Sequence, residues 1–252
     1  MFNTRSAGAT DIGLKRENNE DTFLHAANLG LYIVADGMGG HASGEVASKL
    51  AVEVISDKVQ QGMQLKAAIL AAHQVIISTA EKDATHHGMG STLVALKESE
   101  LDYEIAWVGD SRAYLYNPAS DKATSELHQL TTDHSYVQLL LQNGAIDESE
   151  LNSHPEKSVI TQCLGFSQAA HINIDSVAGE WHQGKRILLC SDGLSDVLSK
   201  EKLLLILEQQ QNNKKCCQAL IQAALDAGSH DNITVMLINA PVDKRCFWSW
   251  SR

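Results

Sequence analysis

Residues 31–45 read LYIVADGMGGHASGE, and the rest of the chain can be placed relative to this stretch. Its first five residues are apolar and partly β-branched, which predicts a short buried strand over residues 31–35. The run ends in Asp36-Gly37, and three of the four residues 37–40 are glycines, which let the backbone approach a ligand closely. The strand therefore presents the carboxylate of Asp36 at a glycine-rich corner, which favours a site for a hard cation.

A hairpin turn is the competing interpretation of this corner, since Asp-Gly is a common two-residue turn. A hairpin requires a second alternating strand directly afterwards, whereas residues 44–60 repeat apolar side chains at helical spacing. We expect Ser43 to cap this helix. A second helix is predicted over residues 64–84, with His73 at its surface or at the boundary of the core.

The composition fits one globular domain, which we expect to cover residues 1–240, followed by a tail of residues 241–252. The chain has 252 residues, 44% of them hydrophobic, and a formal net charge of −11, which argues against nucleic-acid binding. Five cysteines without a Cys-x-x-Cys pair indicate reduced thiols and a cytoplasmic location. The first residues lack the apolar segment of a signal peptide, and no apolar run reaches membrane-spanning length.

The rest of the chain alternates predicted strands with a few helices. Strands are expected over residues 6–13, 22–26, 92–97, 103–108, 113–116, 125–130, 171–177, 185–190 and 233–238. Further helices are expected over residues 134–143, 199–210 and 213–227. The polar, irregular stretch that continues to residue 165 is typical of a binding loop or a lid.

Five aspartates stand at the ends of these predicted strands. Three follow a strand (Asp36, Asp110 and Asp192), and two precede one (Asp21 and Asp231). In an antiparallel sheet the end of one strand lies beside the start of its neighbour, so antiparallel pairing can bring all five to one edge. The alternatives are a plain hairpin turn at Asp110 and a solvated loop over residues 14–21.

Carboxylates gathered in this way require cations between them. Two unit charges ~4 Å apart repel by about 4 kcal/mol at an effective dielectric near 20, and a domain is stable by only ~5–15 kcal/mol. Oxygen ligands without Cys or His at ligand spacing favour Mg²⁺ or Mn²⁺. A pair of such ions promotes in-line displacement at phosphorus, and the guanidinium of Arg16 suits a phosphate. Phosphate-ester hydrolysis is the chemistry that this set of residues predicts.

The chain resembles the bacterial form of the metal-dependent serine/threonine protein phosphatases of the PPM family, also called type 2C. The resemblance extends over residues 10–238 and rests on seven motifs in order, which are GLKRENNED (13–21), ADGMGGHASGEVAS (35–48), GSTLVAL (90–96), VGDSRAYL (108–115), LTTDHS (130–135), LLCSDGLSD (188–196) and DNITVML (231–237). It implies an α+β fold, a four-layer α-β-β-α sandwich in which two stacked antiparallel sheets are flanked by pairs of antiparallel helices.

The resemblance also implies the ligands of two Mn²⁺ or Mg²⁺ ions. Asp36 bridges both ions, the Gly37 carbonyl completes one, and Asp192 with Asp231 completes the other. Some bacterial members hold a third ion, whose ligands match Asp110 and Asp192. Glu20 and Asp21 act mainly through metal-bound water.

Arg16 matches the arginine that binds the substrate phosphate, and Asn232 is expected beside it in a phosphate-binding role. Residues 134–165 match a mobile flap that shapes substrate access. Many eukaryotic members have a histidine, a candidate general acid, where this chain has Met38, which cannot donate a proton. His41 is a substitute, but a structural role at the helix start and protonation by a metal-bound water are equal alternatives.

The resemblance implies hydrolysis of phosphoserine and phosphothreonine by in-line attack of a metal-bridging hydroxide, without a phosphoenzyme. The alternatives are a catalytically silent regulatory or binding module, which would lack metal aspartates, and a hydrolase of small phosphate esters. We expect phosphoprotein substrates, an opposing serine/threonine kinase and a monomer. The aromatic tail is expected to pack on its own domain, with membrane or partner contact as the alternative.

Overall fold

Two antiparallel β-sheets form the centre of the computed structural model, which describes residues 5–39, 43–120, 124–151, 153–166 and 172–241. One sheet has the strand order β1-β11-β10-β7-β8, with bounds Ser6–Asp11, Ile233–Asn239, Arg186–Cys190, Arg112–Asn117 and Glu126–Gln129. The other has the order β2-β3-β5-β6-β9, with bounds Asp21–Ala26, Leu31–Met38, Leu93–Ser99, Asp102–Val108 and Asp175–Glu180. The short strand β4 (Gly90–Ser91) pairs with β3.

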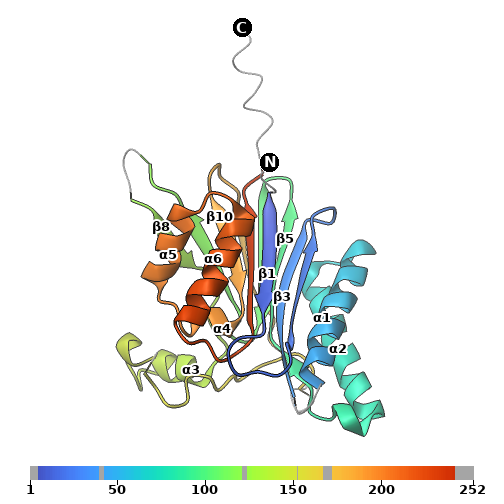
Figure 1. Cartoon of the computed structure of the whole chain (residues 1–252). Coiled ribbons are helices and arrows are strands. Elements are labelled where there is room, and N and C mark those ends of the chain that lie inside the picture. Colours follow the sequence, from blue (N-terminus) through green and yellow to red (C-terminus); the bar gives the residue numbers. More distant parts are fainter. Residues whose placement is uncertain (1–4, 40–42, 121–123, 152, 167–171, 242–252) are drawn as a thin grey trace.

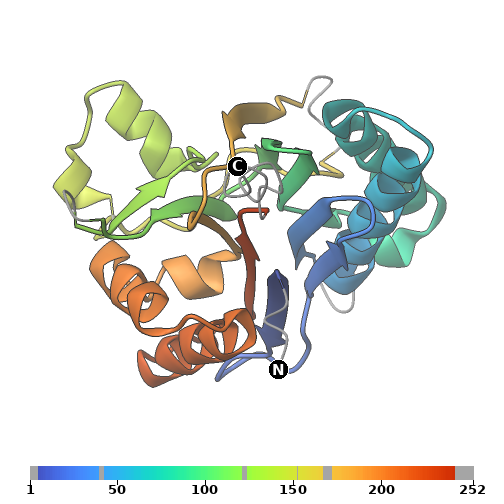
Figure 2. The same cartoon turned by 90° about the horizontal axis from the view of Figure 1, so that it is seen from above.

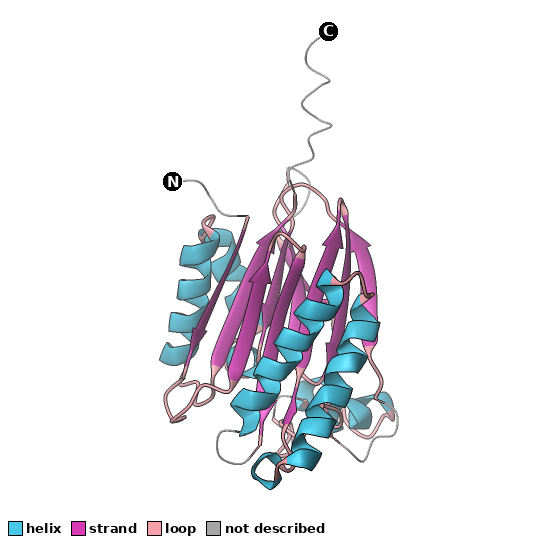
Figure 3. Ribbon diagram, turned by 90° about the vertical axis from the view of Figure 1, so that its right-hand side faces the viewer, coloured by secondary structure: helices cyan, strands magenta, loops and turns pink. Residues whose placement is uncertain are grey.

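Helix pairs cover the outer faces of the two sheets (Figures 1 and 2). The helices α1 (Ser43–Gln60) and α2 (Leu65–Lys82) pack on the sheet that contains β3. The helices α5 (Lys200–Gln209) and α6 (Asn213–Asp226) pack on the sheet that contains β10 and β11. Figure 3 shows the strands enclosed between helices, so the predicted four-layer sandwich is confirmed.

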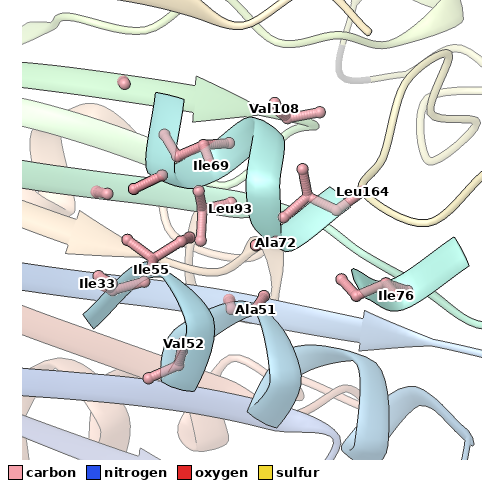
Figure 4. Close-up of a cluster of buried hydrophobic side chains, with 14 of the residues drawn as sticks. Ile33, Ala51, Val52, Ile55, Ile69, Ala72, Ile76, Leu93, Val108 and Leu164 are labelled. Atoms are coloured by element: carbon pink, nitrogen blue, oxygen red, sulfur yellow. The ribbon is translucent and has the colours of Figure 1, made fainter. Parts of the chain in front are cut away.

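The alternating sides of β3 explain why its sequence is apolar without interruption. Leu31, Ile33 and Ala35 pack against α1 and α2, in the core drawn in Figure 4. Tyr32 and Val34 lie in the second core, between the sheets, with residues of β10 and β11. All five side chains are at most 1% exposed, and burying a large apolar side chain contributes about 1.5–3 kcal/mol. The strand that carries Asp36 is therefore held rigidly from both faces.

Three local expectations are corrected by the structure. Strand β3 continues through Asp36 and Gly37 to Met38, because the last residues pair with β4 instead of turning. Ser43 lies inside α1, and its hydroxyl donates to the carbonyl of Thr85 instead of capping the helix. His73 is 2% exposed and so belongs to the core, where its Nδ1 accepts a hydrogen bond from the Gly165 N–H.

The flap, residues 134–165, has little regular structure. It contains α3 (Tyr136–Gln142), shorter than expected, and the 3₁₀ turn η2 (Glu148–Glu150), whereas another such turn, η1 (Ala84–His86), follows α2. Ser135 caps α3. The strand expected over residues 171–177 is β9, which begins at Asp175, while residues 167–171 lie outside the described ranges. The expected tail also lies outside them, except Pro241.

None of the helices in the described ranges combines the length and the apolar character that crossing a lipid bilayer requires.

Candidate functional site

The acidic residues predicted from the sequence lie at the end of the sandwich where α3 and α4 are found (Figure 1). Asp21 begins β2 and is the register partner of Asp36 on β3. Asp192 is the first residue of α4 (Asp192–Ser195), directly after β10. Asp231 lies two residues before β11, and Asp110 lies in the turn between β6 and β7. Antiparallel pairing places strand starts beside strand ends, as expected.

A cleft of about 320 Å³ at this end brings residues of both sheets together. Its lining is mostly polar and consists of Arg16, Glu20, Asp36, Gly37, Met38, Gly39, Thr92, Asp110, Ser158, Ile160, Asp192 and Asp231. A wider groove of about 520 Å³ shares Arg16, Ser158, Asp192 and Asp231 with the cleft. The groove extends toward Lys15 and Lys157. The carboxylates therefore lie where a ligand that enters from the groove would meet them.

The backbone of Asp36 is fixed by Thr92. The Asp36 N–H donates to Oγ1 of Thr92 at 3.2 Å, and the Thr92 N–H donates to the Asp36 carbonyl at 2.8 Å. The same hydroxyl of Thr92 lies 2.8 Å from that of Ser111, one residue after Asp110. Both hydroxyls are buried, so the segments that carry Asp36 and Asp110 are joined by a hydrogen-bonded chain that water does not reach.

Gly37 is required by close packing. A Cβ at this position would lie 2.0 Å from the carbonyl oxygen of Gly44 in α1 and 2.7 Å from that of Glu20. The start of α1 and the strand therefore approach each other as only glycine allows.

Two carboxylate oxygens in the site are buried without a hydrogen-bond partner among the described residues. They are Oδ1 of Asp21 and Oδ1 of Asp192. The other oxygen of Asp21 accepts a hydrogen bond from the hydroxyl of Ser191 at 2.8 Å. A buried acceptor without a partner costs roughly 1–3 kcal/mol, so these two oxygens are suited to a positively charged ligand.

Burial and mutual repulsion raise the pKa values of the carboxylates. The pKa of Asp36 lies well above its ordinary value because the group is desolvated and faces Asp21, Asp192 and other carboxylates. The pKa of Asp192 is raised well above its ordinary value for the same reasons, with the charges of Asp110 and Asp231 as the largest electrostatic causes. Such a set is stable in its ionised form only with cations among its members.

The pKa values of two further carboxylates, Asp21 and Asp110, are also raised. Burial raises the pKa of Asp21 to about 6. Burial, together with the charges of Asp133 and Asp196, raises the pKa of Asp110 to about 7. Asp110 is thus electrostatically part of the group. The alternative of a hairpin at Asp110 is wrong, because β6 and β7 belong to different sheets, and β7 pairs with β10 and β8 instead of with β6.

Arg16 lies at the mouth of the cleft. Its side chain is 51% exposed, and Nη2 donates to Oδ2 of Asp231 at 2.6 Å. This contact is the main cause of the raised pKa of the arginine, which also faces the charges of Glu20 and Asp36. The guanidinium therefore stands beside the carboxylates while part of it remains open to an entering anion.

The expected phosphate-binding role of Asn232 does not fit its surroundings. Its side chain is buried, and Nδ2 donates to the carbonyls of Ile12 and Asn18. Its Oδ1 accepts from the Glu20 N–H at 2.7 Å, and its own N–H donates to Asp231. All donors of Asn232 are therefore used inside the protein, and the residue ties the segment around Glu20 to Asp231 instead of contacting a phosphate.

The candidate general acid cannot be placed, because His41 lies outside the described residues. Met38 is partly buried at the end of β3 and lines the cleft, where its thioether offers no proton.

Sequence reasoning did not identify two residues of the site, Asp196 and Thr92. Asp196, at the end of α4, faces Asp110 and Asp192 and forms an ion pair with Lys157 of the flap at 3.1 Å. Its position four residues after Asp192, one helical turn, was the available signal. Thr92 stands inside the GSTLVAL motif, but its contact with Asp36 depends on strand pairing that no local pattern reveals.

The residues fit divalent cations by their chemistry. The groups in the cleft are carboxylates, a glycine carbonyl and hydroxyls, which are ligands of Mg²⁺ and Mn²⁺. Over the described ranges, no group of three or more His, Cys, Asp or Glu side chains stands in the geometry of a metal site. Converging carboxylates repel one another, so closer approach needs a cation, and the unpartnered oxygens of Asp21 and Asp192 are available for it.

Comparison with known proteins identifies the family. The family model described as protein phosphatase 2C matches residues 14–227. The serine/threonine protein phosphatase PstP of Mycobacterium tuberculosis is 37% identical over 239 residues, which cover 92% of this chain but 44% of PstP. The serine/threonine phosphatase stp of Listeria monocytogenes is 34% identical, over 94% of this chain and 96% of that protein.

The fold agrees with this match. The crystal structure of the PstP catalytic domain in complex with two manganese ions superposes with a TM-score of 0.81. Its sequence is 34% identical, and the alignment covers 93% of this chain and 97% of that domain. The present chain spans less than half the length of the full mycobacterial relative but nearly all of its catalytic domain and of the Listeria protein. The chain therefore belongs to the protein phosphatase 2C family of serine/threonine protein phosphatases.

Proposed function

We propose that this chain is a Mn²⁺- or Mg²⁺-dependent phosphatase that hydrolyses phosphoserine and phosphothreonine in proteins. The observation that carries the proposal is the meeting of carboxylates from both sheets in one cleft, with Arg16 at its mouth. The family supports this activity, and a related catalytic domain binds two manganese ions.

We assign Asp36, the Gly37 carbonyl, Asp192 and Asp231 to two divalent ions. Asp110 together with Asp192 would hold a third, and Glu20 with Asp21 would act through water bound to the ions. The raised pKa values of Asp36 and Asp192 and the unpartnered oxygens of Asp21 and Asp192 support this set. When bound, the ions lower the pKa of water and neutralise charge on phosphoryl oxygens.

Arg16 binds and orients the phosphate. Because Nη2 now donates to Asp231, an arriving phosphate exchanges one anionic partner of the guanidinium for another. If Asp231 held a cation, its carboxylate would bind Arg16 less strongly, which would favour this exchange. Asn232 keeps Asp231 and the loop that follows Arg16 in a fixed relation through its hydrogen bonds.

A covalent cysteinyl-phosphate route does not fit the thiols of the described residues. The four described cysteines are unpaired and buried. Burial raises the pKa of Cys163 to about 11 and that of Cys190 to about 12, so neither supplies a thiolate near neutral pH. Direct attack of water at phosphorus needs no thiolate and is therefore consistent with these raised pKa values. Their unpaired state also supports a reducing compartment, and we propose a cytoplasmic location.

We extend the proposal to the partners that this activity needs. The substrates are phosphorylated proteins, and a serine/threonine protein kinase supplies them. We propose that the chain acts as a monomer.

The test measures phosphate release from phosphothreonine peptides and from p-nitrophenyl phosphate, with Mn²⁺, with Mg²⁺ and with EDTA. We expect metal-dependent turnover that EDTA abolishes, with higher kcat/KM for peptides. Turnover of the small ester alone would indicate a small-molecule hydrolase. No turnover of either substrate, together with tight phosphopeptide binding, would indicate a silent binding module. Either result contradicts the proposal.

A further inference from the structure

The imidazole of His134, outside the set of carboxylates, has an unusually complete set of contacts. Its side chain is 7% exposed and lies near the ring of Trp107. The two ring nitrogens and the backbone N–H and carbonyl of His134 all have hydrogen-bond partners, which lie in the β6–β7 turn, the returning side of the flap and β9. A buried histidine held in this way acts as a junction between segments.

The first partner is Gly109, which directly precedes Asp110. The Gly109 N–H donates to Nδ1 of His134 at 3.1 Å, and the His134 N–H donates to the Gly109 carbonyl at 2.9 Å. Gly109 has a φ of +104°, and a Cβ there would lie 2.7 Å from that of Thr92. The corner before Asp110 is therefore a left-handed glycine whose two backbone groups are both held by His134.

The second partner sets the tautomer of the imidazole. Nε2 of His134 lies 3.3 Å from Oδ2 of Asp175, at the start of β9. Asp175 is itself oriented by Nδ2 of Asn173, which donates to Oδ1 at 2.6 Å. A carboxylate only accepts hydrogen bonds, so the ring hydrogen resides on Nε2, and Nδ1 keeps the lone pair that Gly109 needs.

The third partner is the returning side of the flap. The Thr161 N–H donates to the His134 carbonyl at 2.7 Å, and the neighbouring residues Ser135 and Ile160 form a β-bridge. Ile160 lines the cleft. One residue thus joins the flap wall of the cleft to the corner that presents Asp110.

We propose that His134 is a positioning residue that holds the Gly109–Asp110 corner in place for cation binding and keeps the flap wall in register with it. The proposal rests on the proposed function for the role of Asp110. It predicts that His134 acts through the Gly109 N–H, so an acceptor at the position of Nδ1 is the feature that matters.

The test compares His134→Leu, which removes the acceptor, with His134→Asn, whose Oδ1 can replace Nδ1. His128→Asn is the matched control, because His128 also contacts a carboxylate, Glu126 at 2.8 Å, but on exposed β8. The readouts are amide hydrogen exchange of Gly109 by NMR, Mn²⁺ binding followed by electron paramagnetic resonance, and kcat with KM.

We expect His134→Leu to increase Gly109 exchange at least ~10-fold and to weaken the loosest Mn²⁺ site by about 10–100-fold, the range for residues that orient metal ligands. His134→Asn should keep most of the Gly109 protection, and His128→Asn should resemble the wild type. In an Asp110→Asn background, His134→Leu should cause no further change in Mn²⁺ binding.

Unchanged Gly109 exchange in His134→Leu would overturn the proposal. It would also be overturned if the Asp110→Asn, His134→Leu double variant lost Mn²⁺ affinity by the product of the losses in the two single variants. If His134→Leu does not fold, Asp175→Asn replaces it, and the proposal then requires a smaller loss of Gly109 protection in the same direction. If the wild type shows no metal-dependent hydrolysis, the proposed function fails. The exchange experiment still decides whether His134 holds the corner.

Discussion

The carboxylate rim (Asp21, Asp36, Asp110, Asp192 and Asp231) and the flap are neighbours that are held in different ways. The rim stands at the ends of strands whose register is fixed by two sheets, and Asp21 and Asp36 are direct register partners. The flap has a single buried residue in α3, Val137, while Tyr136, Leu139 and Val159 are exposed. Rigid strands thus carry the proposed cation site, and a segment with few buried side chains forms one wall of the cleft.

The flap is tied to the rest of the molecule at both ends and at its centre, and its first tie is the pair of hydrogen bonds between His134 and Gly109. At its closing end Leu164 is buried in the helix-side core, and Gly165, the last flap residue, donates to His73. At its centre the ion pair of Lys157 with Asp196 crosses the groove. Changes at the rim should therefore act on turnover, and changes at the ties formed by Lys157 and His73 on substrate binding and local stability. The following predictions test this division, beginning with the largest effect.

Asp192→Ala should reduce Mn²⁺-dependent hydrolysis by more than ~100-fold, because residues that merely orient metal ligands already contribute 10–100-fold. The metal-free variant should be at least as stable as the wild type, since the change removes one of several buried carboxylates that repel one another. Turnover and thermal unfolding without metal are the measurements.

The control for Asp192→Ala is Asp226→Ala on α6, which removes an equal charge that accepts a hydrogen bond from Gln222 and lines neither the cleft nor the groove. Near-normal turnover in Asp192→Ala would remove this residue from the cation site. A large loss of stability would instead give it a structural role.

The rim could be predicted from the sequence because each of its members adjoins an apolar run, and antiparallel pairing converts that pattern into proximity. What could not be predicted depends on contacts between distant segments. Asn232 stands beside Asp231, yet its amide binds the backbone at Ile12 and Asn18. His73 occupies an ordinary helical position, yet the flap end that returns 92 residues later buries it.

Arg16→Ala should raise KM for phosphopeptides about 10-fold, since a hydrogen bond to a charged group contributes ~1.5–3 kcal/mol and this guanidinium is half exposed. The effect on kcat should be smaller, because the rim itself remains intact. Steady-state kinetics on one phosphothreonine peptide separate the two constants. Lys15→Ala, next to it and lining the same groove, is the control for loss of charge. An unchanged KM with a collapsed kcat would contradict phosphate binding by Arg16.

The hydrogen bond from the Gly165 N–H to Nδ1 of His73, which ties the end of the flap to α2, should be sensitive to acid. Burial lowers the pKa of His73 below its ordinary value of 6.5, so the unfolded chain takes up this proton at a higher pH than the folded chain. The stabilisation by the neutral imidazole, which accepts from the Gly165 N–H, is therefore fully present above pH 6.5. As the pH falls toward the pKa of the folded state, the free energy of unfolding decreases by at most about 1.4 kcal/mol per pH unit.

His73→Asn tests this pH dependence, because Oδ1 of asparagine can accept from the Gly165 N–H and does not titrate. We expect its unfolding free energy to fall less than that of the wild type between pH 7.5 and pH 5.5 in urea titrations. Parallel curves for the two proteins would show that His73 is not a source of the acid sensitivity.

Lys157→Ala should have the smallest effect and is the most direct test of the division between rim and flap. The ion pair with Asp196 spans 3.1 Å, and its side chains are 36% and 32% exposed, a setting in which such pairs contribute ~0.2–1 kcal/mol. We expect KM for phosphopeptides to rise up to about 5-fold at low salt while kcat stays within 2-fold. At 1 M NaCl the difference should disappear, because the Debye length is then only about 3 Å. Lys15→Ala removes the same charge from the groove without cutting the tie to α4, so an equal rise in KM for both variants would assign the effect to charge alone. A fall in kcat as large as the rise in KM would mean that the flap and the rim act as one unit.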